Sequence, residues 1–113
     1  MELRSPDPSV NPYLAFALII AAGLDGIEKA MPLPSPVDLD LYQAEASVTK
    51  TLAPLPDSLD KAIALANNSS FVKGVIGEEF LAKYLAVKVA EAAAFAAAED
   101  KAEFYKERYF RVI

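Results

Sequence analysis

Few side chains of this 113-residue chain could carry out chemistry. Histidine and cysteine are absent, which removes the usual general base, the usual transition-metal ligand and any thiolate nucleophile. The four glycines are separated from one another, so no glycine-rich loop is present to cradle phosphate groups. Carboxylate and guanidinium chemistry remains, from 16 acidic side chains and from Arg4, Arg108 and Arg111.

One group of carboxylates lies close together in the sequence, formed by Asp38, Asp40 and Glu45. Carboxylate oxygens are the ligands that hard divalent cations prefer. The spacing is not that of a known calcium loop, which needs a central glycine and a terminal glutamate. We therefore interpret the group as a solvated acidic loop, with a cation site as the alternative.

The charge balance restricts the classes of partner. The net charge is −5, whereas binding to nucleic acid or to an anionic membrane surface needs a basic face. The most apolar run, Tyr13 to Leu24, has about twelve residues, and a membrane-spanning helix needs roughly twenty. No secretory signal is recognisable at the start of the chain. We predict a cytoplasmic protein with no nucleic-acid and no membrane partner.

The first half of the chain predicts one long helix between two irregular segments. Glu2 to Pro8 alternates polar and apolar residues like a short strand, and its prolines end it. Asn11 can cap a helix whose first position is Pro12. The helix continues through the Tyr13–Leu24 run, which is apolar on nearly all sides and is therefore predicted to be buried. Pro32 ends it and begins a proline-rich connector to Pro56.

The second half predicts three further helices, so the fold class is mainly α. Ser58 can cap a helix from Leu59 to about Ala66, and Ser70 can open a short one that ends at Gly77. A longer helix begins near Glu78, and an alanine-rich run favours its continuation to residue 98. The tail after it is also helix-spaced. We treat residues 1–113 as a single domain or a fragment, with residues 32–56 as its connector.

Several segments, in order, resemble one enzyme family. Glu2–Ala15, ELRSPDPSVNPYLA, is similar to the glutamine synthetase pattern E-x-R-x-P-D-P-x-x-N-P-Y-L, and Ala22–Ile27 resembles its continuation A-G-L-D-G-I. Leu55–Ile63 is similar to the pattern L-P-x-S-L-x-E-A-L. Ala98–Lys101 departs from the family, which usually has His-Pro before its last helix. The chain thus resembles the C-terminal portion of a glutamine synthetase catalytic domain.

The resemblance implies a chemistry and assigns residues to it. The family joins ammonia to glutamate with ATP, through a γ-glutamyl phosphate and with Mg²⁺ or Mn²⁺, at sites between subunits of a ring. Glu2 matches a carboxylate that binds one of the cations, and Arg4 matches an arginine that holds the substrate carboxylate or the transferring phosphoryl group. Tyr42 matches by position a tyrosine that some bacterial members adenylylate. Because Gln43 and Ala44 break the surrounding pattern, we prefer a loop tyrosine that packs its ring.

Two functions follow as expectations. The first is a fragment of a glutamine synthetase that is inactive alone, because phosphoryl transfer needs charged groups converging from several strands that this chain lacks. ATP and Mg²⁺ or Mn²⁺ would then belong to the parent enzyme. Met1 stands where the family's strand would be interrupted, which favours truncation. The alternative is a naturally short, non-enzymatic protein that self-associates or binds glutamine synthetase subunits. An exposed apolar helix face predicts a homo-oligomer in either case.

Overall fold

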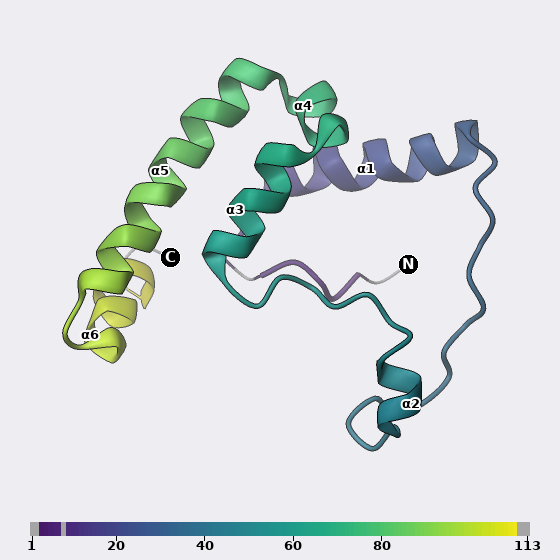
Figure 1. The fold of residues 1–113 in the computed structure, drawn as a ribbon. Coiled ribbons are helices and arrows are strands. Elements are labelled where there is room, and N and C mark those ends of the chain that lie inside the picture. The colour runs from purple at the N-terminus through teal and green to yellow at the C-terminus, as the bar shows by residue number, and fades with distance from the viewer. Residues whose placement is uncertain (1–2, 8, 111–113) are drawn as a thin grey trace.

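The computed structural model describes residues 3–7 and 9–110, and their regular structure is entirely helical (Figure 1). The elements are α1 (Pro12–Glu28), α2 (Ala46–Thr49), α3 (Leu59–Asn68), α4 (Ser70–Ile76), α5 (Glu78–Ala97) and α6 (Lys101–Tyr105), and α6 continues into the π-helix η1 (Lys106–Phe110). The prediction of a mainly α fold is confirmed. No strand occurs in these residues, and Leu3 to Asp7, predicted to be strand-like, form loop and bend.

Capping side chains explain where the helices begin. The Asn11 side chain accepts the backbone N–H groups of Tyr13 and Leu14 at 3.0 and 3.3 Å, as its place before Pro12 predicts. Capping of α3 by Ser58 is confirmed, through the backbone N–H of Lys61. The cap of α4 is Ser69, one residue before the serine that the sequence suggested, and Asp100 caps α6.

The end of α1 is formed by a residue in the left-handed region. Ala30 has φ 46°, and its N–H donates to the carbonyl of Ile27 at 3.1 Å. The N–H of Met31 donates to the carbonyl of Gly26 at 3.0 Å. This pair of bonds is the Schellman arrangement, which satisfies the last carbonyls of a helix. It turns the chain out of α1 directly before Pro32.

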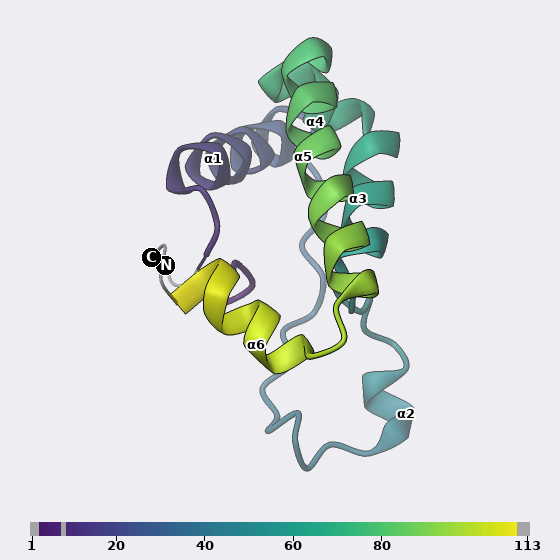
Figure 2. The same cartoon turned by 90° about the vertical axis from the view of Figure 1, so that its left-hand side faces the viewer.

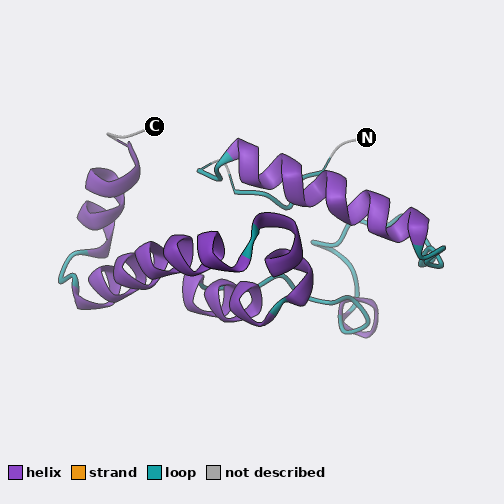
Figure 3. Ribbon diagram, turned by 90° about the horizontal axis from the view of Figure 1, so that it is seen from above, coloured by secondary structure: helices purple, strands orange, loops and turns teal. Residues whose placement is uncertain are grey.

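Helix α4 contacts α1 on one side and the pair formed by α3 and α5 on the other. Helices α3 and α5 lie side by side and run antiparallel, whereas α1 crosses at the α4 end (Figures 1 and 2). At the opposite end of α5, α6 and η1 turn back toward its surface. Viewed from above, α1 lies along one edge of the molecule (Figure 3). Among the described helices, its main contact is with α4.

Burial is sparse in this arrangement. Of the apolar side chains at residues 3–7 and 9–110, those buried are Leu81, Leu85 and Ala92, all on α5. The prediction that the Tyr13–Leu24 helix is buried is wrong for this chain, because α1 contains no buried residue. The helix itself forms as predicted. Its apolar pattern is typical of a buried helix, but the described part of the chain does not supply a surface that covers it.

Whole-molecule dimensions lead to the same conclusion. The accessible surface is 9494 Å², whereas a monomeric protein of 12.2 kDa is expected to expose about 6,100 Å². The radius of gyration is 16.9 Å, and a compact domain of this length would have about 13 Å. The chain thus leaves roughly 3,400 Å² more surface exposed than a self-contained domain would.

The connector between α1 and α3 follows the sequence prediction of little regular structure. Helix α2 is a single turn within it. Leu33 is almost completely exposed, and neighbouring apolar side chains such as Leu39 are about half exposed. In the stretches covered by the structure, none of the helices combines the length and the apolar character needed to cross a bilayer.

Candidate functional site

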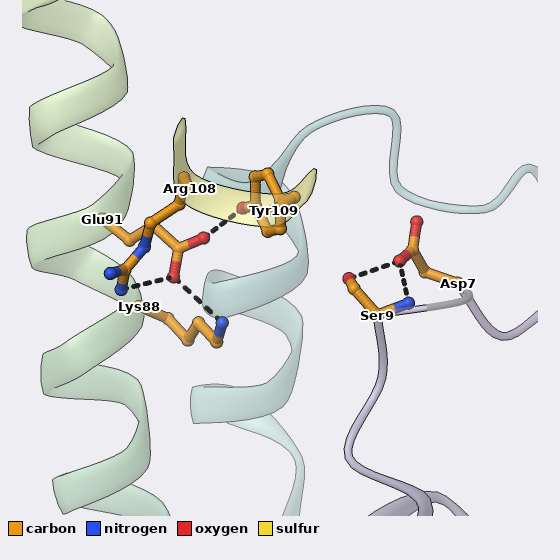
Figure 4. A network of polar contacts seen from close by, with 6 residues as sticks. All are labelled: Asp7, Ser9, Lys88, Glu91, Arg108 and Tyr109. Carbon is orange, nitrogen blue, oxygen red and sulfur yellow. Dashed lines mark hydrogen bonds and ion pairs between the residues drawn. The ribbon is translucent and has the colours of Figure 1, made fainter. Parts of the chain in front are cut away.

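The N-terminal segment carries two of the residues singled out from the sequence. Glu2 lies outside the described residues. Arg4 is exposed on the loop before α1. The loop is fixed by Asp7, whose Oδ1 accepts the Ser9 backbone N–H at 2.8 Å and the Ser9 hydroxyl at 2.5 Å (Figure 4). The hydrogen bond from the Ser9 hydroxyl is the main reason that the pKa of Asp7 lies below its usual 3.8. This turn joins the Arg4 loop to the start of α1.

Tyr42 stands in an isolated turn of the connector. Its backbone N–H donates to the Asp40 carboxylate at 3.0 Å, and the N–H of Gln43 donates to the Asp40 carbonyl at the same distance. The ring of Tyr42 is fully exposed. The interpretation that it packs against the loop is therefore wrong.

The acidic group of the connector does not assemble as a cation site. No cluster of three or more acidic side chains suited to a metal ion occurs where the structure describes the chain. Asp40 is used in the turn just described, and Glu45 accepts the Ser47 hydroxyl at 3.4 Å. The cation alternative for Asp38, Asp40 and Glu45 therefore has no geometric support.

The most elaborate polar cluster lies elsewhere, around Glu91 of α5 (Figure 4). Glu91 is 6% exposed, and its carboxylate accepts a hydrogen bond from the Tyr109 hydroxyl of η1. Lys88 donates to its other oxygen at 3.0 Å, and Arg108 lies 3.7 Å from the same oxygen. We call these four residues the Glu91 clasp. The clasp attaches η1 to the middle of α5.

The electrostatics of the clasp keep Glu91 ionised and Tyr109 neutral. Burial raises the pKa of Glu91, but hydrogen bonds from Tyr109 and Lys88 and the charges of Lys88 and Arg108 outweigh it, so the pKa lies below its usual 4.5. The hydrogen bond to Glu91, with burial, raises the pKa of Tyr109 from 10.0 to about 12. Both groups titrate far from neutral pH. General acid–base catalysis at neutral pH needs a group whose pKa lies near 7. The clasp is a structural device.

Aromatic packing reinforces the same attachment. The ring of Phe95, near the end of α5, lies 5.6 Å from that of Phe104 and 5.1 Å from that of Tyr105. Tyr105 in turn lies 5.8 Å from Tyr109. The Lys101 ammonium donates to the backbone carbonyls of Phe95, Ala96 and Ala98 at the C-terminal end of α5, where a cation is favoured. Segment 98–110 is thus fixed by rings, carbonyls and the clasp together.

Sequence reasoning missed the clasp, although one signal was available. Glu91 occupies the helix face that also carries Tyr84, Val87 and Phe95, where an isolated carboxylate needs partners. Its main partner, Tyr109, is eighteen residues away. Their meeting depends on the turn between α5 and α6, which the amino-acid pattern does not specify.

Comparison with known proteins identifies the family. Residues 1–107 match the family described as glutamine synthetase, catalytic domain. This chain belongs to the glutamine synthetase family. It is 41% identical over 95 residues to the glutamine synthetase of Sulfolobus acidocaldarius, covering 81% of this chain and 20% of that protein. It is 33% identical over 114 residues to that of Methanococcus voltae, covering 99% of this chain and 25% of that protein. The resemblance inferred from the sequence is confirmed.

The match covers most of this chain but only part of each relative. The chain spans between a fifth and a quarter of the length of these two glutamine synthetases. The helical fold agrees with the C-terminal helical part of the catalytic domain. The family match contains Glu2 and Arg4 and ends before Arg108 and Tyr109, so half of the clasp lies beyond it.

Proposed function

We propose that this chain is a C-terminal segment of a glutamine synthetase whose complete form ligates ammonia to glutamate with ATP. We further propose that the 113 residues do not catalyse this reaction alone. The observation that carries the proposal is the family match over residues 1–107 in a chain that spans only 20% to 25% of its relatives. Charge stabilisation around a transferring phosphoryl group requires several converging groups, and these relatives have most of their length outside the match.

Within this proposal, Glu2 contributes one carboxylate to a Mg²⁺ or Mn²⁺ site and Arg4 holds the substrate carboxylate or the phosphoryl group. A hard cation takes six or more oxygen ligands, and a forked guanidinium suits a carboxylate or phosphate. The residues of this chain do not fit a complete cation or ATP site, since the described part brings no acidic cluster together and the sequence has no glycine-rich loop. The chain would supply one edge of the site.

A chimaera tests these assignments. Residues 1–113 would replace the matching segment of the Sulfolobus acidocaldarius glutamine synthetase, and ATP-dependent glutamine formation would be measured. We expect activity. In the chimaera, Glu2→Gln should raise the Mg²⁺ concentration needed by roughly 10- to 100-fold. Arg4→Lys should lower kcat about 100-fold, because an ammonium cannot replace a bidentate fork.

The matched control for these variants is Asp38→Asn, which removes a carboxylate from the connector and should leave both quantities unchanged. An active chimaera whose Mg²⁺ dependence is insensitive to Glu2→Gln would contradict the cation role. An inactive chimaera would contradict the family function itself, provided that its helical content and assembly match the parent.

We also propose a cytoplasmic location, which the absence of cysteine supports. If the complete enzyme is regulated by adenylylation, Tyr42 is the proposed acceptor. Its full exposure supports access by a modifying enzyme. Incubation with an adenylyltransferase and labelled ATP, with Tyr42→Phe as the control, tests this assignment.

The second candidate is a naturally short protein that self-associates or binds glutamine synthetase subunits. The observation that favours it is the excess of exposed surface over that of a compact domain. We propose that the isolated chain is a homo-oligomer through its exposed apolar helix faces. Sedimentation velocity at micromolar concentration tests this proposal, and a clean monomer would contradict it.

A further inference from the structure

Helix α1 presents an uncovered apolar face. Its five members are exposed by between 54% and 84%, and they follow one another at intervals of three or four residues, so they form one stripe along the helix. The members are Tyr13, Phe16, Ile20, Leu24 and Ile27. We call this stripe the outer face of α1. The opposite side, with Leu14 and Leu18, is half-buried where α1 contacts α4.

The outer face is symmetric about its central residue. Phe16 and Leu24 lie four residues before and after Ile20, and Tyr13 and Ile27 lie seven residues before and after it. A second α1 that runs antiparallel and is centred on the same residue therefore places Phe16 opposite Leu24 and Tyr13 opposite Ile27. A two-fold symmetric interface requires this kind of self-complementary patch. The spacing also suits two helices packed at about 20°.

Charge favours the antiparallel direction. Helix α1 has no charged residue before Asp25, and Asp25 pairs with Lys29 at 2.8 Å. In a parallel pair the two copies of Glu28 would lie at the same end. In an antiparallel pair each Glu28 lies near the N-terminus of the other helix, where negative charge is favoured. The antiparallel arrangement thus avoids repulsion and aligns the helix dipoles favourably.

The exposed area is sufficient for a weak but specific dimer. The two aromatic and three aliphatic side chains of the outer face offer roughly 600 Å² per copy. Pairing would remove about 1,200 Å² in total, which is the lower limit for a stable, specific interface. We propose that two copies of this chain pair antiparallel through the outer face of α1, centred on Ile20. This inference rests on the proposed self-association and adds the face, the direction and the register.

Single cysteines test the register directly, because the natural chain has none. Ile20→Cys should crosslink to its own copy with a short bismaleimide. Tyr13→Cys should not, because the two substituted positions would lie about 21 Å apart along the helix axis. A mixture of Tyr13→Cys and Ile27→Cys should give a mixed crosslink. Equal self-crosslinking at positions 13 and 20 would overturn the register.

A charge in the outer face tests the interface itself. Ile20→Glu should convert the sedimenting dimer to a monomer with unchanged helical circular dichroism. The matched control is Val89→Glu, at a half-exposed position of α5, which should leave the dimer intact. A dimer that survives Ile20→Glu would overturn this inference but not self-association. A natural chain that is monomeric would overturn both, while the chimaera's activity would still decide the family function separately.

Discussion

Removing one hydroxyl group should weaken the attachment of the C-terminal segment to α5. Tyr109→Phe keeps the ring, and so keeps its packing on Tyr105, but removes the hydrogen bond to the buried Glu91 carboxylate. That bond is the main cause of the rise in the pKa of Tyr109 from 10.0 to about 12, which corresponds to an upper limit of roughly 3 kcal/mol. Hydrogen bonds to charged groups contribute about 1.5–3 kcal/mol.

We therefore expect Tyr109→Phe to weaken the attachment of α6 and η1 by about 2 kcal/mol. Amide hydrogen exchange of residues 101–110 measures this directly, and its protection should fall roughly 30-fold. Amides in α3 should change far less, since they do not depend on the clasp. The matched control is Tyr42→Phe, because the Tyr42 side chain is fully exposed and its hydroxyl makes no contact within residues 3–7 and 9–110. Equal protection in the two variants would refute the reasoning.

The dependence of this effect on pH follows from the same bond. The folded pKa of Tyr109 lies above its unfolded value, so its contribution is complete below pH 10 and is lost as pH rises through about 12. The folded pKa of Glu91 lies below its usual 4.5, so its contribution is present above that pH and is lost as pH falls through the folded value. The difference between wild type and Tyr109→Phe should be constant across neutral pH.

Backbone and capping variants at three positions give further tests by urea unfolding. Ala30→Gly should raise the free energy of unfolding by about 1 kcal/mol, because Ala30 has φ 46°, where glycine is not strained. A lower free energy of unfolding would contradict the Schellman ending of α1. Gly77→Ala should lower it by about 1–2 kcal/mol, because Gly77 joins α4 to α5 at φ 86°, and no change would show that this turn relaxes freely. Asn11→Ala should lower it by about 1 kcal/mol through loss of the α1 cap, whereas Asn11→Ser, a comparable cap, should restore most of it.

Local features of the fold could be read from the sequence, and features that depend on distant partners could not. Asn11 and Ser58 act on N–H groups within three residues, so their capping roles are encoded locally. The burial of α1 depends on a covering surface, and its apolar pattern cannot say whether that surface is in the chain. The Tyr42 ring is likewise exposed, although the sequence favoured a packed one.

The same distinction between local and distant partners applies to the candidate site. The roles proposed for Glu2 and Arg4 follow from the family pattern in neighbouring residues alone. The clasp between Glu91 and Tyr109 could not be predicted, because it depends on the angle at which α6 leaves α5. In the sequence, its sign was a glutamate at helical spacing from Tyr84, Val87 and Phe95.

The most direct test of the central claim is an activity measurement on the purified 113-residue chain. ATP-dependent formation of glutamine from glutamate and ammonia would be assayed with Mg²⁺ and with Mn²⁺, with the active chimaera as the positive control. A segment that supplies one edge of the site should give no turnover above the blank, even at high protein concentration. Measurable ligation by the chain alone would contradict the account.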